Sequence, residues 1–220
     1  MNPHSEVVAI VSRNADKALA KAKEYGLVGV NCYTDYDQAL KDSRVDIVCI
    51  CTPNHLHTVQ TIKAAEAGKH ILIEKPIALS WDDALAMKKA VDKAGVKTLV
   101  GYVLRWNPLF ETAKKIQDRF LGRLYYAETD YFHRVTETYP CYDWTRKKSV
   151  GSSSLLAGGC HAIDAIRWFM QSDVIEVTAY SSKSRNDLEF DGTIAVLLKF
   201  ANGTITKRSE ERRVGKECRS

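Results

Sequence analysis

The sequence has none of the features that mark a membrane protein or a disulfide-stabilised protein. No apolar run approaches the roughly 20 residues that a helix needs to cross a bilayer. The first residues do not show the basic and then apolar layout of a signal peptide. The six cysteines have no repeated spacing, and Cys49 and Cys51 lie in an apolar run where we expect them to be buried as small hydrophobic residues. These absences favour a cytoplasmic protein with reduced thiols.

The chain has little excess charge once its last segment is set aside. Its formal net charge is +5. Residues 208–220 have no apolar period, differ abruptly in composition and resemble the conceptual translation of a sequencing adapter, so we interpret them as a non-native tail. This tail holds five Lys or Arg and three Asp or Glu, which leaves 27 basic and 24 acidic residues and a net charge of +3. A charge this small gives no support for nucleic-acid binding.

The first half of the chain alternates between strand and helix patterns. Residues 7–11 and 46–51 are short apolar runs, which are typical of parallel strands covered on both faces. Asn14 is a plausible helix N-cap and Gly26 a helix stop. Strands separated by helices indicate a doubly wound parallel sheet. The pattern predicts strands at residues 7–11, 46–51, 71–73 and 98–100, and helices at 15–25, 55–67 and 80–94.

The second half changes character near Asn107. A long alternating stretch is typical of an extended strand, and the pair Asn202-Gly203 is a strong hairpin signal. The mixture indicates an α+β domain with an antiparallel sheet. The predicted helices are residues 109–120 and 161–170, and the predicted strands are 123–134, 174–181 and 193–200.

A Gly-x-Gly-x-x-Gly motif, which forms the phosphate-binding turn of a Rossmann-like sheet, is absent. The strand at residues 7–11 resembles the second strand of such a sheet, so we expect a first strand–turn–helix unit of roughly 30 residues to be missing. Ser12 and Arg13 then stand where the second strand meets the adenosine ribose. A hydroxyl and a guanidinium suit a 2′-phosphate, which favours NADP over NAD. An incidental arginine in a surface turn is the alternative.

Three segments in series resemble the Gfo/Idh/MocA family of oxidoreductases, the glucose–fructose oxidoreductase and inositol dehydrogenase type. The first contains Cys51-Thr-Pro-Asn-His-Leu-His57 and then Ile73-Glu-Lys-Pro76. The second is Gly101-Tyr-Val-Leu-Arg-Trp-Asn-Pro108, and the third is Ser152-Ser-Ser-Leu-Leu-Ala-Gly-Gly-Cys-His-Ala-Ile-Asp164. The succession of Thr-Pro-Asn and Glu-Lys-Pro at this spacing is specific to the family.

The resemblance implies that the cofactor lies against loops that follow the strands. Ligands of such sheets bind at the carboxyl ends of the strands, which agrees with this placement. A plain turn capped by Asn54 is the alternative. Together with the ribose position, the implied cofactor-binding set is Ser12, Arg13, Thr52, Pro53, Asn54, His57, Glu74, Lys75, Arg105 and Trp106.

Lys75 and His161 are the implied catalytic residues. When hydride leaves a carbinol carbon, the hydroxyl proton also leaves and alkoxide charge develops, which a lysine ammonium stabilises or relays. His161 suits hydrogen bonding to a substrate hydroxyl or its deprotonation. Asp164 shares a helix face with His161 and is expected to orient its ring or to bind substrate. The alternatives are a lysine paired with Glu74 and a structural histidine–aspartate pair.

Two further residues complete the expected substrate-binding set, and no metal site is expected. Arg105 lies where the chain crosses between the domains, and Trp144 lies in a loop that we expect to cover the cleft. Two cysteines and two histidines between residues 49 and 57 are suitable zinc ligands. They would have to converge from a strand and a helix turn, so buried packing is the simpler interpretation of the cysteines.

One position departs from the resemblance. The family's better-studied polyol dehydrogenases have an aspartate four residues before the histidine, where this chain has Ala157. This departure keeps two other hypotheses open. One is a non-catalytic NAD(P)-binding or sensor protein, and the other is a family member that uses transient oxidation for elimination or glycoside cleavage.

The sequence therefore predicts two domains and one activity. Residues 1–106 are expected to form a Rossmann-like domain without its first unit, and residues 107–207 a truncated α+β domain. The parent protein is expected to be a homo-oligomeric NAD(P)-dependent dehydrogenase or reductase. It would transfer hydride to or from a hydroxyl or carbonyl carbon of a sugar, polyol or cyclitol. The chain alone is expected to be inactive, because it lacks the phosphate-binding turn.

Overall fold

The computed structural model describes residues 4–132, 136–139, 141–183 and 185–211. The chain divides into two compact units that are each discontinuous in sequence. Unit 1 comprises Met1–Cys51, His57–Ile73 and Asp82–Leu99, and unit 2 comprises Thr52–Leu56, Glu74–Trp81 and Val100–Ser220. The short segments that carry the Thr-Pro-Asn and Glu-Lys-Pro motifs therefore belong to the same unit as the second half of the chain. Within the described ranges, no helix is both long and apolar enough to span a membrane.

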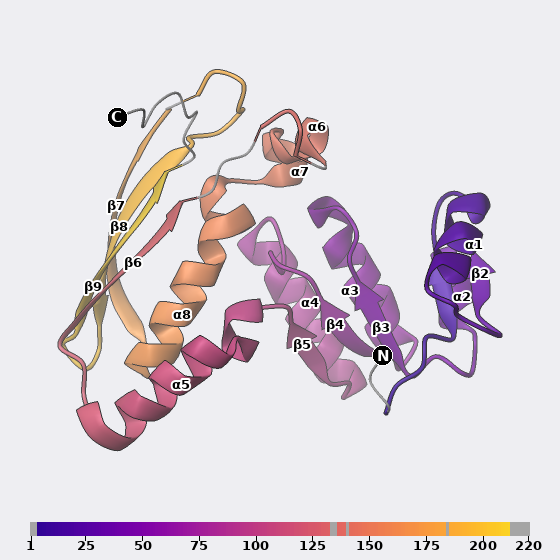
Figure 1. Cartoon of the computed structure of the whole chain (residues 1–220), viewed down its shortest axis with the longest axis horizontal. Helices are drawn as coiled ribbons and strands as arrows, with labels where there is room; N and C mark the ends of the chain where they lie inside the picture. The colour runs from indigo at the N-terminus through magenta and orange to yellow at the C-terminus, as the bar shows by residue number, and fades with distance from the viewer. Residues whose placement is uncertain (1–3, 133–135, 140, 184, 212–220) are drawn as a thin grey trace. The chain divides into compact units, whose positions relative to one another are not determined.

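Unit 1 consists of short strands alternating with helices (Figure 1). β1 pairs in parallel with β2, and a second sheet has the order β3-β4-β5, in which β3 and β4 are parallel. The predicted arrangement of parallel strands separated by helices is confirmed. The strands are β1 (Ala9–Val11), β2 (Asn31–Tyr33), β3 (Ile47–Ile50), β4 (His70–Ile73) and β5 (Thr98–Val100), and the helices are α1 (Ala15–Glu24), α2 (Tyr36–Leu40), α3 (His57–Glu66) and α4 (Trp81–Ala94).

Local signals placed α1 correctly, whereas two short elements were missed. The side chain of Asn14 accepts a hydrogen bond from the backbone N–H of Lys17, as an N-cap does. Gly26 follows the helix with φ +62°, a left-handed conformation that favours glycine at a helix end. β2 and α2 were not predicted, because three and five residues are too few for a hydrophobic period to show.

The burial expected for Cys49 and Cys51 is wrong. Both side chains are exposed. β3 lies at the edge of its sheet, and within the strand only Ile50 is buried. A strand packed on one face buries every second side chain, whereas the apolar run had predicted cover on both faces.

Unit 2 contains a four-stranded sheet with the long helix α8 along one face (Figure 1). The strand order is β6-β9-β8-β7. β7–β8 and β8–β9 are antiparallel, but β6–β9 is parallel. The sheet predicted to be antiparallel is therefore mixed. Its parallel pair joins β9 to the edge strand β6, and several elements separate these two strands in the sequence. The strands are β6 (Tyr126–Phe132), β7 (Val174–Ser182), β8 (Thr193–Phe200) and β9 (Ile205–Glu211).

Helices and single helical turns connect these strands. η1 and η2 are 3-10 turns, and η3 and η4 are π-helical turns. The predicted helix at residues 109–120 is α5 followed by η3. The elements are η1 (Asn54–Leu56), η2 (Val103–Trp106), α5 (Pro108–Ile116), η3 (Gln117–Leu121), α6 (Tyr142–Thr145), α7 (Lys148–Gly151), η4 (Leu155–Gly159) and α8 (Cys160–Met170).

β9 extends beyond the position at which a non-native tail was expected to begin. Residues 208–211 form the end of this strand and pair with both β6 and β8. Residues 212–220, which make up the rest of that segment, lie outside the described residues. So do residues 133 and 134, the end of the strand predicted at 123–134.

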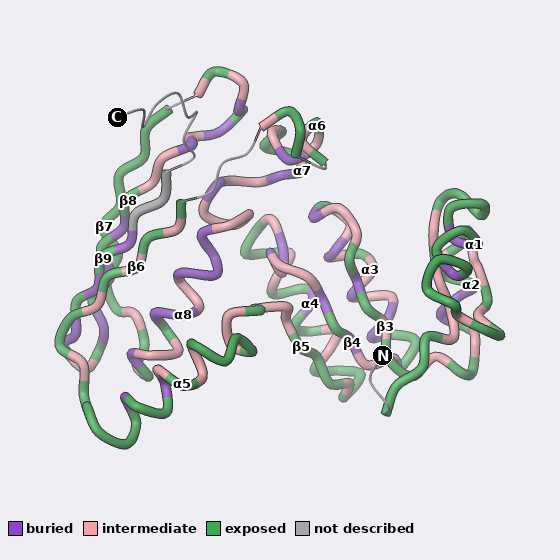
Figure 2. Tube along the Cα trace, in the orientation of Figure 1, coloured by how far each residue is buried: buried purple, intermediate pink, exposed green. Residues whose placement is uncertain are grey.

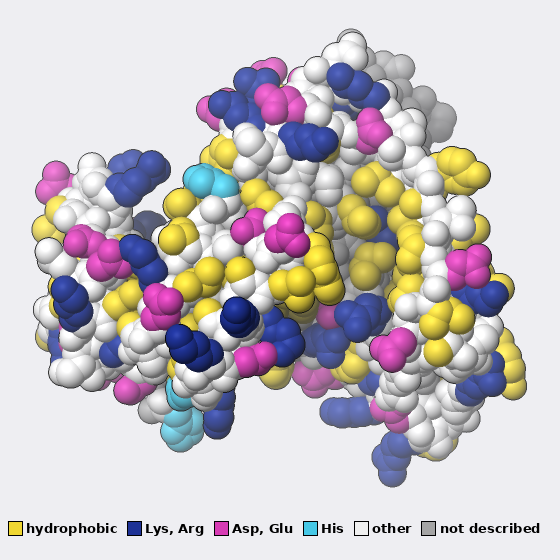
Figure 3. Space-filling model, turned by 180° about the vertical axis from the view of Figure 1, so that it is seen from behind, with side chains coloured by type: hydrophobic (Ala, Val, Ile, Leu, Met, Phe, Trp, Pro, Cys, Tyr) yellow, Lys and Arg dark blue, Asp and Glu magenta, His cyan; other side chains and the backbone are white. Residues whose placement is uncertain are grey.

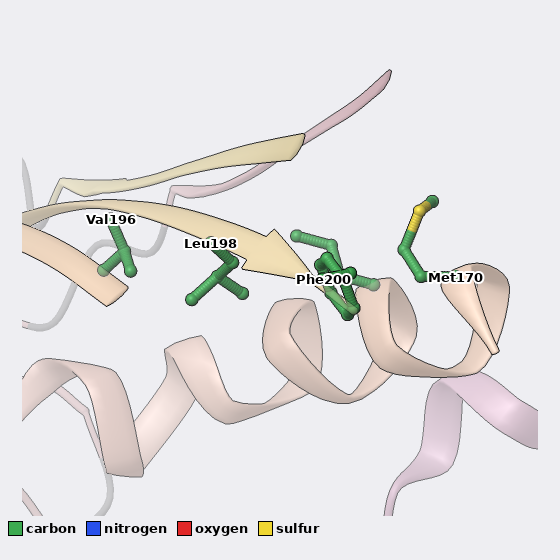
Figure 4. Packing of buried hydrophobic residues seen from close by; sticks show 5 residues of the cluster. Met170, Val196, Leu198 and Phe200 are labelled. Atoms are coloured by element: carbon green, nitrogen blue, oxygen red, sulfur yellow. The ribbon is translucent and has the colours of Figure 1, made fainter. Parts of the chain in front are cut away.

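The core of unit 2 lies between α8 and β8. Val196, Leu198 and Phe200 alternate along β8 and point toward the helix (Figure 4), where they pack with Ile166 and Met170. Their neighbours in the strand are exposed, as the alternating colours in Figure 2 show. Full burial of a side chain of this size contributes about 1.5–3 kcal/mol. The position of α8 therefore depends on this face of the sheet.

Two side chains fix the C-terminal end of α8. Gln117 Nε2 donates to the carbonyl oxygen of Phe169 at 2.7 Å, and Asn202 Nδ2 donates to that of Met170 at 3.3 Å. The last carbonyl groups of a helix have no partner within the helix, so these bonds satisfy groups that would otherwise be unpaired.

Adjacent leucines on β8 test the one-sided packing of this sheet. Leu198 is 5% exposed and faces α8, whereas Leu197 is 48% exposed. We expect Leu198→Ala to lower the free energy of unfolding by about 2–5 kcal/mol, because it leaves a cavity. The matched control Leu197→Ala is expected to cost less than about 1 kcal/mol. Urea unfolding followed by circular dichroism measures both, and equal losses would contradict the assignment of inner and outer faces.

Candidate active site

Lys75 joins two of the motif segments within unit 2. Its Nζ donates to the carbonyl oxygen of Ala157 at 3.1 Å. Ala157 belongs to the π-helical turn η4, and such turns are frequent at functional sites. The bond between Lys75 and Glu74 is made instead by the backbone N–H of Lys75, which donates to Glu74 Oε2 at 3.2 Å. The ammonium group is thus held next to the segment that leads into His161.

His161 lies in the first turn of α8 and is 7% exposed. Its ring lies between two tyrosine rings, with the centroid of Tyr102 at 6.3 Å in an edge-to-face arrangement and that of Tyr131 at 6.2 Å. Nδ1 of His161 is buried and has no hydrogen-bond partner among the described residues. A buried polar atom of this kind is uncommon and is often satisfied by a ligand or water.

The surroundings of His161 favour the neutral imidazole. Burial lowers its pKa below the usual value, and the nearby Lys75 ammonium lowers it further. The carboxylates of Glu74 and Asp164 act in the opposite direction but more weakly. Burial also raises the pKa of Tyr102 to about 12, so its hydroxyl remains protonated at neutral pH.

Arg105 and Asp164 form a two-pronged ion pair. Nε of Arg105 donates to Oδ2 of Asp164, and a terminal guanidinium nitrogen donates to Oδ1, both at 2.8 Å. The guanidinium carbon also lies 5.4 Å from the centre of the Trp168 ring. Asp164 shares a helix face with His161, as the sequence predicted. The partner that its carboxylate contacts, however, is Arg105.

Trp144 lies in α6, in a segment held by a different set of contacts. The hydroxyl of the neighbouring Tyr142 donates to Asp187, which also pairs with Arg185. In the part of the chain that the structure describes, Trp144 forms no hydrogen bond or ring contact with Lys75 or His161. The following helix α7 contacts η1. The structure therefore places this segment beside the Thr-Pro-Asn turn without placing Trp144 against the pair Lys75 and His161.

The Thr-Pro-Asn turn contains a buried asparagine. Thr52 and Pro53 are partly buried, and Asn54 is buried at the start of η1. The Asn54 side chain makes no hydrogen bond within the described ranges of the chain. His57 follows in unit 1 as a buried residue at the beginning of α3.

The predicted ribose-contacting residues lie in unit 1, at the end of β1. The hydroxyl of Ser12 accepts from the backbone N–H of Asn14 at 3.3 Å, so it is part of the turn that begins α1. Arg13 is exposed, and its guanidinium has no hydrogen bond or ion pair among the described residues. Trp106, in unit 2, is also exposed.

Three groups at this site were missed by reasoning from the sequence. They are the rings of Tyr102 and Tyr131 and the carbonyl oxygen of Ala157. Tyr131 occupies an inward position of the alternating strand β6, which was a usable signal. The space for its ring comes from Gly158, where a Cβ atom would lie 2.7 Å from the ring. A backbone carbonyl gives no signal in a sequence.

No metal centre accompanies these groups within the described residues. No cluster of three or more His, Cys, Asp or Glu side chains there is placed to hold a metal ion.

Two family models match successive stretches of the chain. Residues 1–102 match the family model described as the oxidoreductase family, NAD-binding Rossmann fold. Residues 110–209 match the GFO/IDH/MocA C-terminal domain.

Individual proteins that are similar to this chain are named as dehydrogenases. The 4-carboxy-2-hydroxymuconate-6-semialdehyde dehydrogenase of Sphingobium sp. is 41% identical over 47% of this chain and 32% of its own length. The D-xylose 1-dehydrogenase (NADP(+)) 2 of Haloferax volcanii is 28% identical over 92% of this chain and 60% of its own. A solved structure of levoglucosan dehydrogenase in complex with NADH and levoglucosan has a TM-score of 0.86 and 28% identity, and the match covers 96% of this chain and 60% of that one.

The chain spans about a third to three fifths of the length of these relatives. The two family models together match residues 1–102 and 110–209, which is most of the chain. The chain therefore belongs to the Gfo/Idh/MocA family of oxidoreductases.

Proposed function

We propose that the protein is an NAD(P)-dependent dehydrogenase or reductase that acts on a hydroxyl or carbonyl carbon of a sugar, polyol or cyclitol. The observation that carries this proposal is the pairing of a lysine ammonium with a buried, neutral histidine. Lys75 is bonded to the turn that leads into α8, and His161 lies in the first turn of that helix. The two side chains are close enough for the charge of one to lower the pKa of the other.

These two groups suit the proton side of hydride chemistry. A neutral imidazole accepts a hydrogen bond or a proton from a substrate hydroxyl. The ammonium of Lys75 stabilises the negative charge that develops on the same oxygen. Its partner is a neutral carbonyl rather than a carboxylate, so its charge is not cancelled by that contact.

The residues around the Thr-Pro-Asn turn fit a nicotinamide cofactor. The side-chain amide of Asn54 makes no hydrogen bond within the described ranges, which suits a ligand that carries its own donors and acceptors, such as a carboxamide. A bound nicotinamide would supply the acceptor or donor of the hydride. Thr52, Pro53 and Glu74 would complete the protein surface that holds it.

The proposed substrate class follows the relatives. Levoglucosan and D-xylose appear in the names of two of them. Each of these compounds carries several hydroxyl groups on a compact carbon frame. We place the protein in the cytoplasm on the sequence argument alone.

Replacement of Lys75 tests the catalytic assignment. In the parent protein, which the sequence predicts to be active, we expect Lys75→Ala to lower kcat about 10²- to 10³-fold, because alkoxide charge loses its stabilisation. The matched control Lys115→Ala, on the exposed side of α5, should leave kcat within about twofold of the unchanged protein. The measurement is absorbance of the reduced nicotinamide with a panel of sugars and polyols.

The same assay separates the rival hypotheses. Cofactor binding without turnover on any member of the panel would favour a non-catalytic sensor. Product formed with no net change in the redox state of the cofactor would favour transient oxidation.

Arg13 decides the choice between NADP and NAD in our proposal. Its guanidinium is exposed and unpaired in the described part of the chain, so it can meet a 2′-phosphate without breaking another contact. We expect Arg13→Ala to weaken NADPH binding about tenfold and to leave NADH binding nearly unchanged. Fluorescence titration measures both affinities, and Lys17→Ala on the same helix is the control for general loss of positive charge. An equal effect on NADPH and NADH would remove the argument for NADP.

We also propose that the protein forms homo-oligomers through the sheet face opposite α8. Apolar side chains are exposed there, and two ion pairs, Lys199–Glu176 and Lys207–Glu128, lie among them. Exposed apolar side chains beside paired charges suit a surface that meets a copy of itself. Figure 3 views the molecule from behind, where basic and acidic side chains are scattered among hydrophobic ones, and does not look straight onto this face of the sheet. The exposed apolar residues are Tyr126, Tyr180, Leu197 and Ile205.

Light scattering on Tyr180→Glu tests this surface. A buried carboxylate without a partner is costly, so we expect the variant to be monomeric at concentrations where the unchanged protein associates. Leu85→Glu, on an exposed position of α4, is the control. A monomeric unchanged protein would rule out the proposal for this chain.

A further inference from the structure

Asp164 is the carboxylate that a helical arrangement brings toward His161. The two residues are three positions apart in α8, which places their side chains on one face. The buried Nδ1 of His161 has no hydrogen-bond partner among the described residues. A free carboxylate in this position would be expected to bond to the imidazole. Both of its oxygens, however, accept hydrogen bonds from Arg105.

We propose that Arg105 is a positioning residue, whose guanidinium holds the Asp164 carboxylate against η2 and away from His161, so that the imidazole stays neutral. The role of His161 as a base rests on the proposed function above. The placement of the carboxylate does not depend on it.

The geometry of the pair supports this role. A planar guanidinium that donates two parallel hydrogen bonds fixes both the position and the plane of the carboxylate. Asp164 has a side chain that is only 12% exposed, so water does not screen its charge well. Arg105 is further held over the Trp168 ring, one turn beyond Asp164 on α8. Two contacts with α8 therefore hold the guanidinium in place.

Arg105 also lies close in sequence to a residue that contacts His161 directly. Tyr102, three residues before Arg105, has its ring edge-to-face with the imidazole. The segment from Tyr102 to Arg105 therefore contacts α8 at successive turns, first at His161 and then at Asp164 and Trp168. Loss of the ion pair would loosen the same segment that packs against the imidazole.

The groups that face His161 come from four elements. Lys75 and Glu74 come from the Glu-Lys-Pro segment, and Asp164 comes from α8 itself. Tyr102 precedes η2, and Tyr131 lies in β6. Tyr102 stays protonated at neutral pH, so it adds no charge.

The direction of the effect follows from these charges. An unpaired carboxylate beside a buried imidazole favours the protonated form and raises its pKa. Imidazolium can no longer accept a proton, so the ion pair with Arg105 preserves the form that a base requires. Burial and Lys75 act in the same direction, because both lower the pKa of His161.

The test is an NMR titration of the histidine side chains in the whole chain, labelled with ¹⁵N. His161→Gln identifies the resonance of His161 among the six histidines. We expect Arg105→Gln to raise the pKa of His161 and to shift its ring nitrogens toward imidazolium at about pH 7. Asp164→Asn should lower the pKa instead. The double variant Arg105→Gln/Asp164→Asn should lose the rise, because the carboxylate that causes it has been removed.

Arg105→Lys separates the two-pronged bond from the charge. Lysine keeps the positive charge but cannot hold both oxygens in one plane, so we expect a smaller rise than with glutamine. This variant also tests the proposal if Arg105→Gln does not fold. An unchanged His161 titration in Arg105→Lys would then overturn the proposal. In a folded Arg105→Gln variant, a titration like that of the unchanged protein would overturn it as well.

Kinetics distinguish positioning from substrate binding. If Arg105 positions Asp164, kcat in Arg105→Gln falls about tenfold more near pH 6 than near pH 9, while KM stays within about twofold. A rise in KM at all pH values with an unchanged His161 titration would make Arg105 a substrate ligand and overturn the proposal. The NMR result stands without turnover, so failure of the proposed function and failure of this inference remain distinguishable.

Discussion

The packing of α8 on one face of the mixed sheet is the constraint on which the site depends. Val196, Leu198 and Phe200 bury the sheet side of the helix, and Gln117 satisfies a carbonyl at its C-terminal end. The opposite end of the same helix carries His161. Because interiors are close-packed, a helix held in this way has little freedom to rotate. The direction of the imidazole is therefore set by hydrophobic contacts up to three turns away.

The electrostatics of the site follow from burial. A histidine that is 7% exposed is costly to charge, and the Lys75 ammonium adds to that cost. The one carboxylate on the same helix face is occupied by Arg105. Lys75 in turn donates to the backbone carbonyl oxygen of Ala157. The arrangement leaves a cation and a neutral imidazole side by side, which suits chemistry in which an oxygen gives up a proton.

Much of the fold was predictable because its signals are local. Asn14 and Gly26 placed α1, and the pair Asn202-Gly203 marked the turn between β8 and β9. Signals that depend on neighbouring elements were misleading. The apolar run around Cys49 predicted burial on both faces, but β3 lies at a sheet edge and exposes that side chain. The direction of β6 relative to β9 was also not readable, because the strands are separated by most of the unit.

The sequence by itself determined the family, the alternation of strands and helices, and the identity of Lys75 and His161 as candidates. Those conclusions rest on residue types and on spacing along the chain. Only the tertiary structure decided what each candidate contacts. It assigned Asp164 to Arg105, placed Tyr102 and Tyr131 around the imidazole, and provided a backbone carbonyl for Lys75. The physical reason is that hydrogen bonds and charges act over a few ångströms in space, and residues 82 positions apart, such as Lys75 and Ala157, reach that range only after folding.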